Sequence, residues 1–291
     1  MTVVVTGATG RLGRLVVEQL IARGIEPGII TATGRDRSRL AELERLGVVA
    51  VASEYVDRAS LDAVFAGAAT LFFVSGNAVG ERIPQHTNVV EAARQAGVGW
   101  IVYTSVAHAD ASPLELAAEH RFTEELLLTS GIATTILRNN WYTENFVQLV
   151  QQADRQNEIL VGWNDGRIAS ASRLDYAEGA AAVLTTSGHE GKVYELTGDV
   201  AWSGDDLTQA ASVILGHPVL LARRTTDEQE IDFQQAGLSH ERAAAMIRMD
   251  QAIRQGALAD ATPTLRNLIG RPTTPLLVGL REAYEAETAA L

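Results

Sequence analysis

The stretch Thr6-Gly7-Ala8-Thr9-Gly10-Arg11-Leu12-Gly13 places three glycines at a G-x-x-G-x-x-G spacing. An apolar run at residues 2–6 precedes it, and residues 12–22 follow with helical spacing of their apolar side chains. A strand-to-helix turn of this kind needs one glycine where the chain reverses, one where the backbone touches a pyrophosphate and one where helix and strand pack closely. The N–H groups at the helix start also attract phosphate. The stretch therefore predicts a dinucleotide-binding turn, although three glycines could also make a tight turn that binds nothing. The predicted contacts are Gly7, Thr9, Gly10, Arg11, Leu12 and Gly13.

Outward from this turn, the first 140 residues alternate between short apolar runs and longer stretches with helical periodicity. Such alternation is typical of a parallel sheet wound with helices, whose strands are apolar because helices cover both faces. The predicted strands are residues 2–6, 29–33, 48–51, 70–74, 100–105 and 133–138, and the predicted helices are residues 12–22, 38–46, 60–65, 85–96 and 114–129. The pattern predicts an α/β fold with a Rossmann-like, doubly wound parallel sheet.

After residue 138 this rhythm changes, and helical patterns prevail. We expect helices at residues 141–153, 205–215, 227–235, 241–255 and 275–287, strands at 193–197 and 219–222, and few strands in the Gly-rich residues 161–172. A further helix opens near residue 173, where Asp175 and Glu178 have the spacing of a capping box. Because these pieces interleave with the sheet, we expect one domain over residues 1–291. Its dinucleotide-binding core would be residues 1–140, and residues 141–291 would form a small, mainly helical C-terminal lobe on the substrate side.

The composition excludes several classes of protein. With 291 residues and 46% hydrophobic content the chain can bury a core, and without cysteine it has no disulfide, thiolate metal site or cysteine nucleophile. The formal net charge of -12 disfavours binding to nucleic acid or to anionic membranes. Residues 64–74 are too short an apolar run to span a bilayer, and Met1 leads directly into the first strand rather than into a basic leader, so we expect a cytoplasmic protein. The histidines show no metal-ligand spacing, so we predict no metal.

The end of the second predicted strand indicates which nicotinamide cofactor would bind. An NAD-binding unit usually carries an acidic residue there, which accepts from the ribose hydroxyls. Here the sequence reads Thr31-Ala32-Thr33-Gly34, and Arg35 and Arg37 follow, whose guanidinium groups suit a 2′-phosphate. We therefore expect NADP(H) rather than NAD. Asp36 argues against this, and the two arginines could simply be solvated.

The carboxyl ends of the strands in such a sheet form the ligand crevice. Ser75 and Gly76 after the fourth strand, Thr104 and Ser105 after the fifth, and Asn139 after the sixth are the predicted further cofactor contacts, and Asn140, Trp141 and Tyr142 are the predicted substrate contacts. Each has another interpretation. Residues 75–76 could be an ordinary loop, the two asparagines could cap a helix, and at least one of the two aromatic residues could lie in the core.

Five segments together resemble the NmrA-like branch of atypical short-chain dehydrogenases. They are the glycine stretch itself, Gly34-Arg35, His86-Thr-Asn-Val-Val-Glu-Ala-Ala, Trp100-Ile-Val-Tyr-Thr-Ser and Arg138-Asn-Asn-Trp-Tyr-Thr-Glu-Asn. Within that branch the chain is most similar to NADPH-dependent quinone oxidoreductases of the QOR2 type, with triphenylmethane dye reductases as relatives. The resemblance runs over nearly the whole chain. It implies a Rossmann-like core, NADPH and reduction of a small quinone-like substrate, and it leaves a homodimer open.

Typical short-chain dehydrogenases donate a proton from a Tyr-x-x-x-Lys pair, which this chain lacks. The resemblance to lysine-bearing relatives such as isoflavone reductases places His120 where their lysine falls, and Tyr142 is the second catalytic candidate. His120 could bond the nicotinamide ribose or donate a proton, because the ordinary pKa of histidine is near neutrality. It could also be a half-exposed helix residue without a role. A quinone suits a site without that pair, since a hydroquinone anion is far less basic than the alkoxide from a ketone.

Two other functions compete with a quinone reductase. A non-enzymatic NADP-binding redox sensor of the NmrA type would also lack the Tyr-Lys pair, and a triphenylmethane or azo dye reductase would use the same cofactor. The specific segment from Arg138 to Asn145 favours the enzyme.

Overall fold

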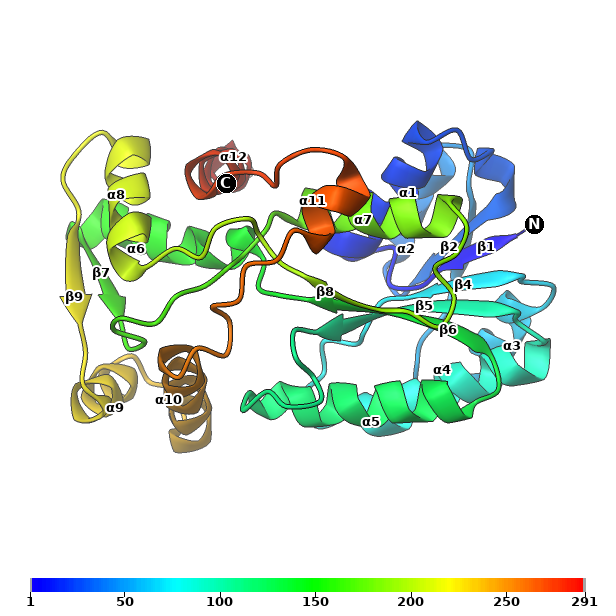
Figure 1. The fold of residues 1–291 in the computed structure, drawn as a ribbon, viewed down its shortest axis with the longest axis horizontal. Coiled ribbons are helices and arrows are strands. Elements are labelled where there is room, and N and C mark those ends of the chain that lie inside the picture. Colours follow the sequence, from blue (N-terminus) through cyan, green and yellow to red (C-terminus); the bar gives the residue numbers. More distant parts are fainter. Residues whose placement is uncertain (1, 290–291) are drawn as a thin grey trace.

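The computed structural model describes residues 2–289, so Met1, which we expected to lead into the first strand, lies outside the described residues. The first part of the chain alternates strictly between strands and helices (Figure 1). Its elements are β1 (Val3–Val5), α1 (Arg11–Ala22), η1 (Pro27–Ile29), β2 (Ile30–Gly34), α2 (Arg37–Glu44), β3 (Val49–Ala52), α3 (Arg58–Phe65), β4 (Thr70–Phe73), α4 (Arg82–Ala96), β5 (Trp100–Val106), α5 (Glu115–Thr129) and β6 (Ala133–Asn139). Every predicted strand of this part begins and ends within one residue of the prediction.

The seven-stranded sheet is parallel and has the order β3-β2-β1-β4-β5-β6-β8, where β8 is Val193–Leu196. Strand β1 pairs with β2 on one side and with β4 on the other, so that Val5 lies opposite both Ala32 and Phe72. The direction of winding reverses between β1 and β4, and a crevice opens there at the carboxyl ends of the strands. The predicted Rossmann-like fold is confirmed.

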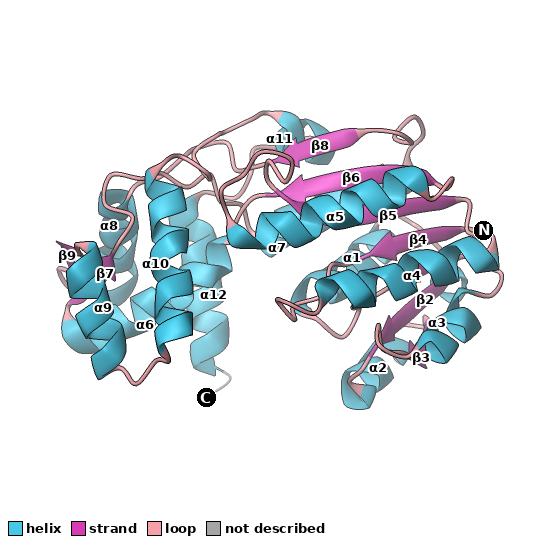
Figure 2. Cartoon of the chain, turned by 90° about the horizontal axis from the view of Figure 1, so that it is seen from below, coloured by secondary structure: helices cyan, strands magenta, loops and turns pink. Residues whose placement is uncertain are grey.

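Alternating side chains of the apolar strands supply two separate cores, one on each face of the sheet. Val3 and Val5 pack with α1 and with α7 (Arg173–Thr185), whereas Val4 packs with α3, α4 and α5. The period of two along a strand sends neighbouring side chains to opposite faces, so both faces must be apolar. Figure 2 shows α3, α4 and α5 together on one of these faces.

The second part of the chain both completes the sheet and builds a lobe beyond it. Strand β8 joins the sheet edge, α7 packs on α1, and α11 (Thr264–Ile269) packs on α7 and β8. The lobe contains η2 (Thr143–Phe146), α6 (Val147–Gln156), β7 (Glu158–Val161), α8 (Gly204–Leu215), β9 (Leu220–Arg223), α9 (Thr226–Gln235), α10 (His240–Arg254) and α12 (Leu276–Ala289). In Figure 1, β7, β9 and α8 lie at the end of the molecule opposite β1. This arrangement places a mainly helical lobe at the carboxyl ends of the strands.

The second part of the chain departs from the sequence predictions in four places, one of which is the short helix α11, which was not predicted. The helix predicted from residue 141 begins only at Thr143, because Tyr142 is held extended by a bridge to Ala171. Strand β7 was not predicted; it forms because β9 pairs with it in a two-stranded parallel sheet. The capping box of α7 is made by Ser172 and Asp175 rather than by Asp175 and Glu178, since Ser172 Oγ accepts from Asp175 N at 3.0 Å.

Within the described residues, three features are absent: a membrane-spanning helix, a metal-binding cluster and a cis peptide bond. Within residues 2–289, no helix is long and apolar enough to cross a membrane. Over the same residues, no group of three or more His, Asp or Glu side chains is arranged to hold a metal ion. The backbone of that part of the chain contains no cis peptide bond.

Candidate functional site

The glycine turn has the geometry that a close-approaching ligand needs. Gly7 has a φ of +59°, which side-chain-bearing residues rarely adopt, and a Cβ built on Gly13 would collide with the Gly7 carbonyl. Gly10 is the N-cap residue of α1 and offers no side chain to the N–H groups of the first turn. Those N–H groups and the positive end of the helix dipole therefore face the turn without a side-chain cap. The residues present fit a bound pyrophosphate.

A pocket of about 260 Å³ adjoins this turn and carries three guanidinium groups. Its lining is Ala8, Thr9, Gly10, Arg11, Arg14, Arg39 and Leu43. Arg39 Nη1 donates to Thr9 O at 2.9 Å, and Gly34 lets β2 approach because a Cβ there would collide with Thr9 Oγ1. The pocket therefore brings guanidinium groups beside the helix start, which suits a phosphate.

The arginines that we predicted for a 2′-phosphate lie close to this pocket but do not line it. Both Arg35 and Arg37 are exposed. Burial raises the pKa of Tyr55, and the positive charge of Arg35, which lies nearby, partly offsets this rise. Asp36, the residue that argued against NADP, is the N-cap of α2 and accepts from Ser38 N and Arg39 N. This carboxylate is therefore engaged locally by α2.

Of the residues predicted at the strand ends, Ser75 and Thr104 bind each other, whereas Ser105 is bound to an internal carboxylate. Ser75 N donates to Thr104 Oγ1 at 2.9 Å, so the ends of β4 and β5 are tied together. Ser105 instead donates to Glu124 Oε1, which also accepts from Arg138 Nε at 3.0 Å. Burial would lower the pKa of Arg138, but hydrogen bonds from its guanidinium to Glu124 and to Glu195 raise it. Ser105 thus belongs to an internal ion-pair network.

The two asparagines at the end of β6 have different surroundings. Asn140 Oδ1 accepts from Trp141 N at 2.6 Å, and Asn140 Nδ2 donates to Leu258 O at 3.2 Å. Asn140 therefore ties β6 to the C-terminal lobe, and it does not cap the following helix, whose N-cap residue is Tyr142. Asn139 Oδ1 is buried, and among the described residues it has no hydrogen-bond partner. A buried acceptor of this kind is costly unless a ligand or water donates to it.

The two aromatic residues after β6 diverge. Trp141 packs with the core of the C-terminal lobe, whereas Tyr142 packs with the sheet core. The ring of Tyr142 meets Tyr176 edge-on at 5.4 Å, and the guanidinium of Arg173 lies 4.8 Å from its centroid. Burial raises the pKa of Tyr142, so its hydroxyl keeps the proton at neutral pH.

His120 lies in the interior and is not the half-exposed residue that one interpretation assumed. The residue is only 4% exposed, and its Nδ1 lies 2.8 Å from the hydroxyl oxygen of Tyr103. Burial, followed by the charge of Arg82, lowers the pKa of His120 to about 3. The expectation that His120 ionises near neutrality is therefore wrong in this structure, and the ring is neutral at physiological pH.

The comparisons with known proteins agree with this geometry. A family described as NAD(P)H-binding matches residues 7–187, more than half of the chain. The chain belongs to the NAD(P)H-binding family. Quinone oxidoreductase 2 of Escherichia coli (strain K12) is 40% identical over 274 residues, which cover 94% of this chain and 96% of that protein.

Two solved structures match this family member over almost its full length. The NADPH-dependent quinone oxidoreductase of Escherichia coli in complex with NADPH has a TM-score of 0.91 at 38% identity, and the match covers 99% of this chain and 100% of that one. The triphenylmethane reductase of Citrobacter sp. has a TM-score of 0.91 at 34% identity, covering 98% and 100%. The resemblance seen in the motifs is confirmed, as are the predictions of an oxidoreductase and of a nicotinamide cofactor.

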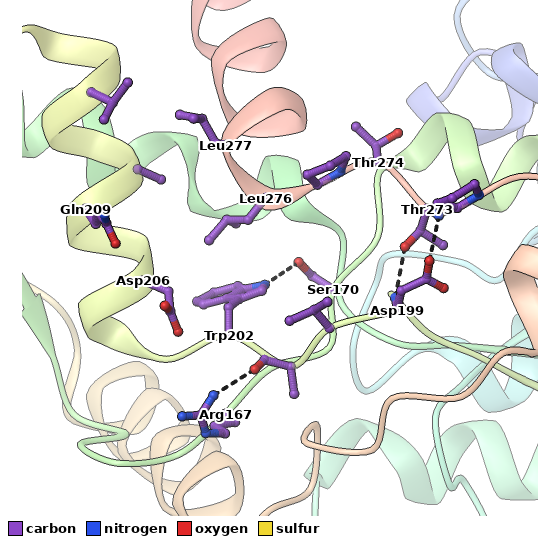
Figure 3. A pocket seen from close by; sticks show the side chains of 16 residues that line it. Arg167, Ser170, Asp199, Trp202, Asp206, Gln209, Thr273, Thr274, Leu276 and Leu277 are labelled. Carbon is purple, nitrogen blue, oxygen red and sulfur yellow. Dashed lines mark hydrogen bonds between the residues drawn. The ribbon is translucent and has the colours of Figure 1, made fainter.

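A larger cavity lies elsewhere in this NAD(P)H-binding chain. Figure 3 shows it between α8 and the start of α12, with Trp202 as part of its lining. Its volume is about 670 Å³. Trp202 Nε1 donates to Ser170 Oγ at 2.8 Å, and Asp199 N donates to Thr273 Oγ1 at 2.9 Å. None of the predicted site residues lines it. The larger cavity is therefore separate from the glycine turn and from the other predicted site residues.

Proposed function

We propose that the protein is an NADPH-dependent reductase that transfers a hydride to a quinone or a related electron-poor aromatic acceptor. The observation that carries this proposal is the phosphate-binding turn beside a pocket with three arginines, in a chain without a Tyr-x-x-x-Lys pair. The similarity of the chain to a quinone oxidoreductase and to a triphenylmethane reductase supports the same class of acceptor.

The choice of NADPH over NADH follows from charge. The turn would hold the pyrophosphate through the N–H groups at the start of α1, which include those of Leu12 and Gly13. The pocket beside it offers the guanidinium groups of Arg11, Arg14 and Arg39 to the 2′-phosphate, and Arg35 adds positive charge nearby. An NADH molecule has no 2′-phosphate and would make no use of these guanidinium groups.

The protein's own groups would then position the reactants. A bound nicotinamide supplies the hydride. Asn139 Oδ1 is the buried acceptor that an amide N–H could satisfy. We expect the half-buried rings of Trp141 and Tyr142 to border the aromatic acceptor. At neutral pH His120 carries no imidazolium proton to give, so water or a neutral N–H donor would protonate the reduced acceptor. A hydroquinone anion tolerates such a weak donor, whereas an alkoxide does not.

The test is NADPH oxidation followed by absorbance with benzoquinone, a naphthoquinone, a triphenylmethane dye and an azo dye, against buffer and against NADH. We expect turnover with at least one quinone and a clear preference for NADPH. Turnover with the dyes alone would identify a dye reductase. Tight NADPH binding without turnover on any acceptor would instead favour the NmrA-type sensor and contradict the proposal.

The remaining expectations about partners and location stay predictions. The net charge of -12 leads us to propose small-molecule partners rather than nucleic acid or anionic membranes. A cytoplasmic location and a homodimer belong to the same proposal. Fractionation and the mass of the protein in solution would test these two points.

A further inference from the structure

The backbone of the loop that follows β4, residues 74–81, is bound by side chains from other elements. Val74 N donates to Thr6 Oγ1 at 3.0 Å, and Ser75 N donates to Thr104 Oγ1 at 2.9 Å. Thr104 lies on β5, and Thr6 directly follows β1. The start of this loop is therefore fixed to the same strand ends that border the crevice, before any ligand arrives.

The next peptide group of the loop is bound by a buried histidine in a defined protonation state. Gly76 N donates to His86 Nε2 at 3.0 Å, so Nε2 carries no proton. Thr123 Oγ1 donates its one proton to Glu119 O at 2.9 Å, so it must accept from His86 Nδ1, which lies 2.8 Å away. The hydrogen bonds therefore specify the neutral tautomer of His86 with its proton on Nδ1.

The surroundings of His86 favour this neutral form. The residue is fully buried, and its ring lies edge-on to Phe73 at 4.9 Å and to Tyr103 at 5.9 Å. Burial, followed by the charge of Arg82, lowers the pKa of His86 to about 3. Protonation of His86 Nε2 would place its N–H group against the Gly76 N–H group, so that two donors would face each other. The acceptor at Nε2 is thus available throughout the physiological pH range.

The carbonyl oxygen of Gly76 is also bound by a side chain of α4. Arg82 Nε donates to Gly76 O at 2.6 Å, and Arg82 Nη1 donates to Glu119 Oε2 at 3.0 Å. Glu119 Oε1 in turn accepts from Gly80 N at 2.9 Å. Both polar groups of Gly76 are therefore held, and the loop is anchored on α4 and α5 together.

We propose that His86 is a positioning residue of the cofactor site, which holds Gly76 and its loop in the conformation that receives the cofactor at the end of β4. The inference rests on the proposed function only for the presence of NADPH, and it does not depend on the acceptor. A loop fixed in its binding conformation loses little entropy when the ligand arrives, so its release lowers affinity. Loss of one buried hydrogen bond of this kind corresponds to about a tenfold change in affinity.

The test compares His86→Leu with His86→Gln in the folded protein. Leucine removes the acceptor for Gly76 N–H, so we expect the NADPH Kd to rise about tenfold and hydrogen exchange at the Gly76 amide to accelerate. Glutamine can present Oε1 in place of Nε2, so its Kd should stay within about threefold of the wild type. The matched control is His189→Leu, which removes a histidine bonded to Tyr194 near the start of β8 and should leave the Kd unchanged.

Other results would overturn the inference. An unchanged Kd in a folded His86→Leu protein, or a glutamine variant as weak as the leucine variant, would contradict it. Long-range proton–nitrogen NMR of the wild type must place the proton on Nδ1, and a proton on Nε2 would also contradict it; this readout holds even where a variant does not fold. NADPH binding with no quinone turnover would count against the proposed acceptor alone.

Discussion

At the scale of single residues, the charge beside the glycine turn is distributed unevenly. Arg14 pairs with both Glu18 and Glu42, and hydrogen bonds to these carboxylates raise its pKa. Arg11 pairs with Glu287 at 3.0 Å. Arg39 lies beside one carboxylate, that of Asp36, at a longer 3.5 Å from its Nε. Arg39 therefore has the charge that is least compensated within the pocket and is the best placed to bind a 2′-phosphate.

We accordingly expect Arg39→Ala to weaken NADPH binding by roughly tenfold to a hundredfold, the value of one charge-assisted hydrogen bond. Binding of NADH should change little, because it has no 2′-phosphate. Calorimetric titration with both cofactors measures the difference. Arg37→Ala is the matched variant, since Arg37 lies in the first turn of the same helix but does not line the pocket. An equal loss in both variants would place the phosphate outside this pocket.

The sequence indicated arginines in this region but not which of them lines the pocket. The motif located Arg35 and Arg37, because they follow the strand directly. Arg39 reaches Thr9 O only because Asp36 starts α2 there and sets the direction of its first turn. The signal was present in the sequence as Asp36 at a helix start, but it required knowing where α2 begins. Similarly, nothing in the sequence linked His86 to Gly76, since that contact depends on how α4 packs under the loop.

At the scale of elements, local patterns were sufficient wherever the neighbours of a strand are fixed by the fold. The strands of the core were predicted because each is a short apolar run between helices that cover it. The lobe was harder. Strand β7 pairs with β9, which lies far along the chain, and the bridge from Tyr142 to Ala171 delays a helix that the local pattern predicts to start earlier. Long-range pairing of this kind overrides local periodicity.

The turn between β1 and α1 gives the prediction for this scale. Gly13→Ala should lower the free energy of unfolding by about 1–3 kcal/mol and abolish NADPH binding, because a Cβ would collide with the Gly7 carbonyl. Gly10→Ala should be milder in stability, since its Cβ would lie 3.1 Å from the same oxygen, but should still weaken NADPH binding. Urea unfolding and NADPH titration measure the two effects. Gly28→Ala is the control, because a Cβ there meets nothing within 4 Å.

At the scale of the whole molecule, buried polar groups join the lobe to the core. Asp175 is fully buried at the start of α7, where its Oδ1 lies 2.8 Å from Arg271 Nη2 and its Oδ2 accepts from Thr274 N at 2.9 Å. Arg138 binds Glu195 of β8 from β6 at 3.0 Å. These contacts bind α7 to the segment before α12 and β6 to β8, and removing one member would leave an uncompensated buried charge.

The two buried histidines make the stability of this assembly depend on pH. In the folded protein the pKa values of His86 and His120 are each lowered to about 3, whereas in the unfolded chain both should titrate near 6.5. The unfolded chain therefore binds more protons between these values, so stability falls as the pH decreases from about 6.5 toward 3. Between pH 7 and pH 5 each histidine should contribute a loss on the order of 2 kcal/mol. Urea unfolding at the two pH values measures the total.

His120→Gln separates this contribution from that of the carboxylates. Glutamine cannot ionise, so the loss of stability between pH 7 and pH 5 should shrink by about 2 kcal/mol relative to the wild type. The matched His-to-Gln control is made at His240, which is exposed at the start of α10. An identical pH dependence in the wild type and His120→Gln would mean that His120 takes up a proton as readily in the folded protein as in the unfolded chain. That result would restore His120 as an acid that could act near neutral pH, and it would remove the reason for assigning protonation of the reduced acceptor to water.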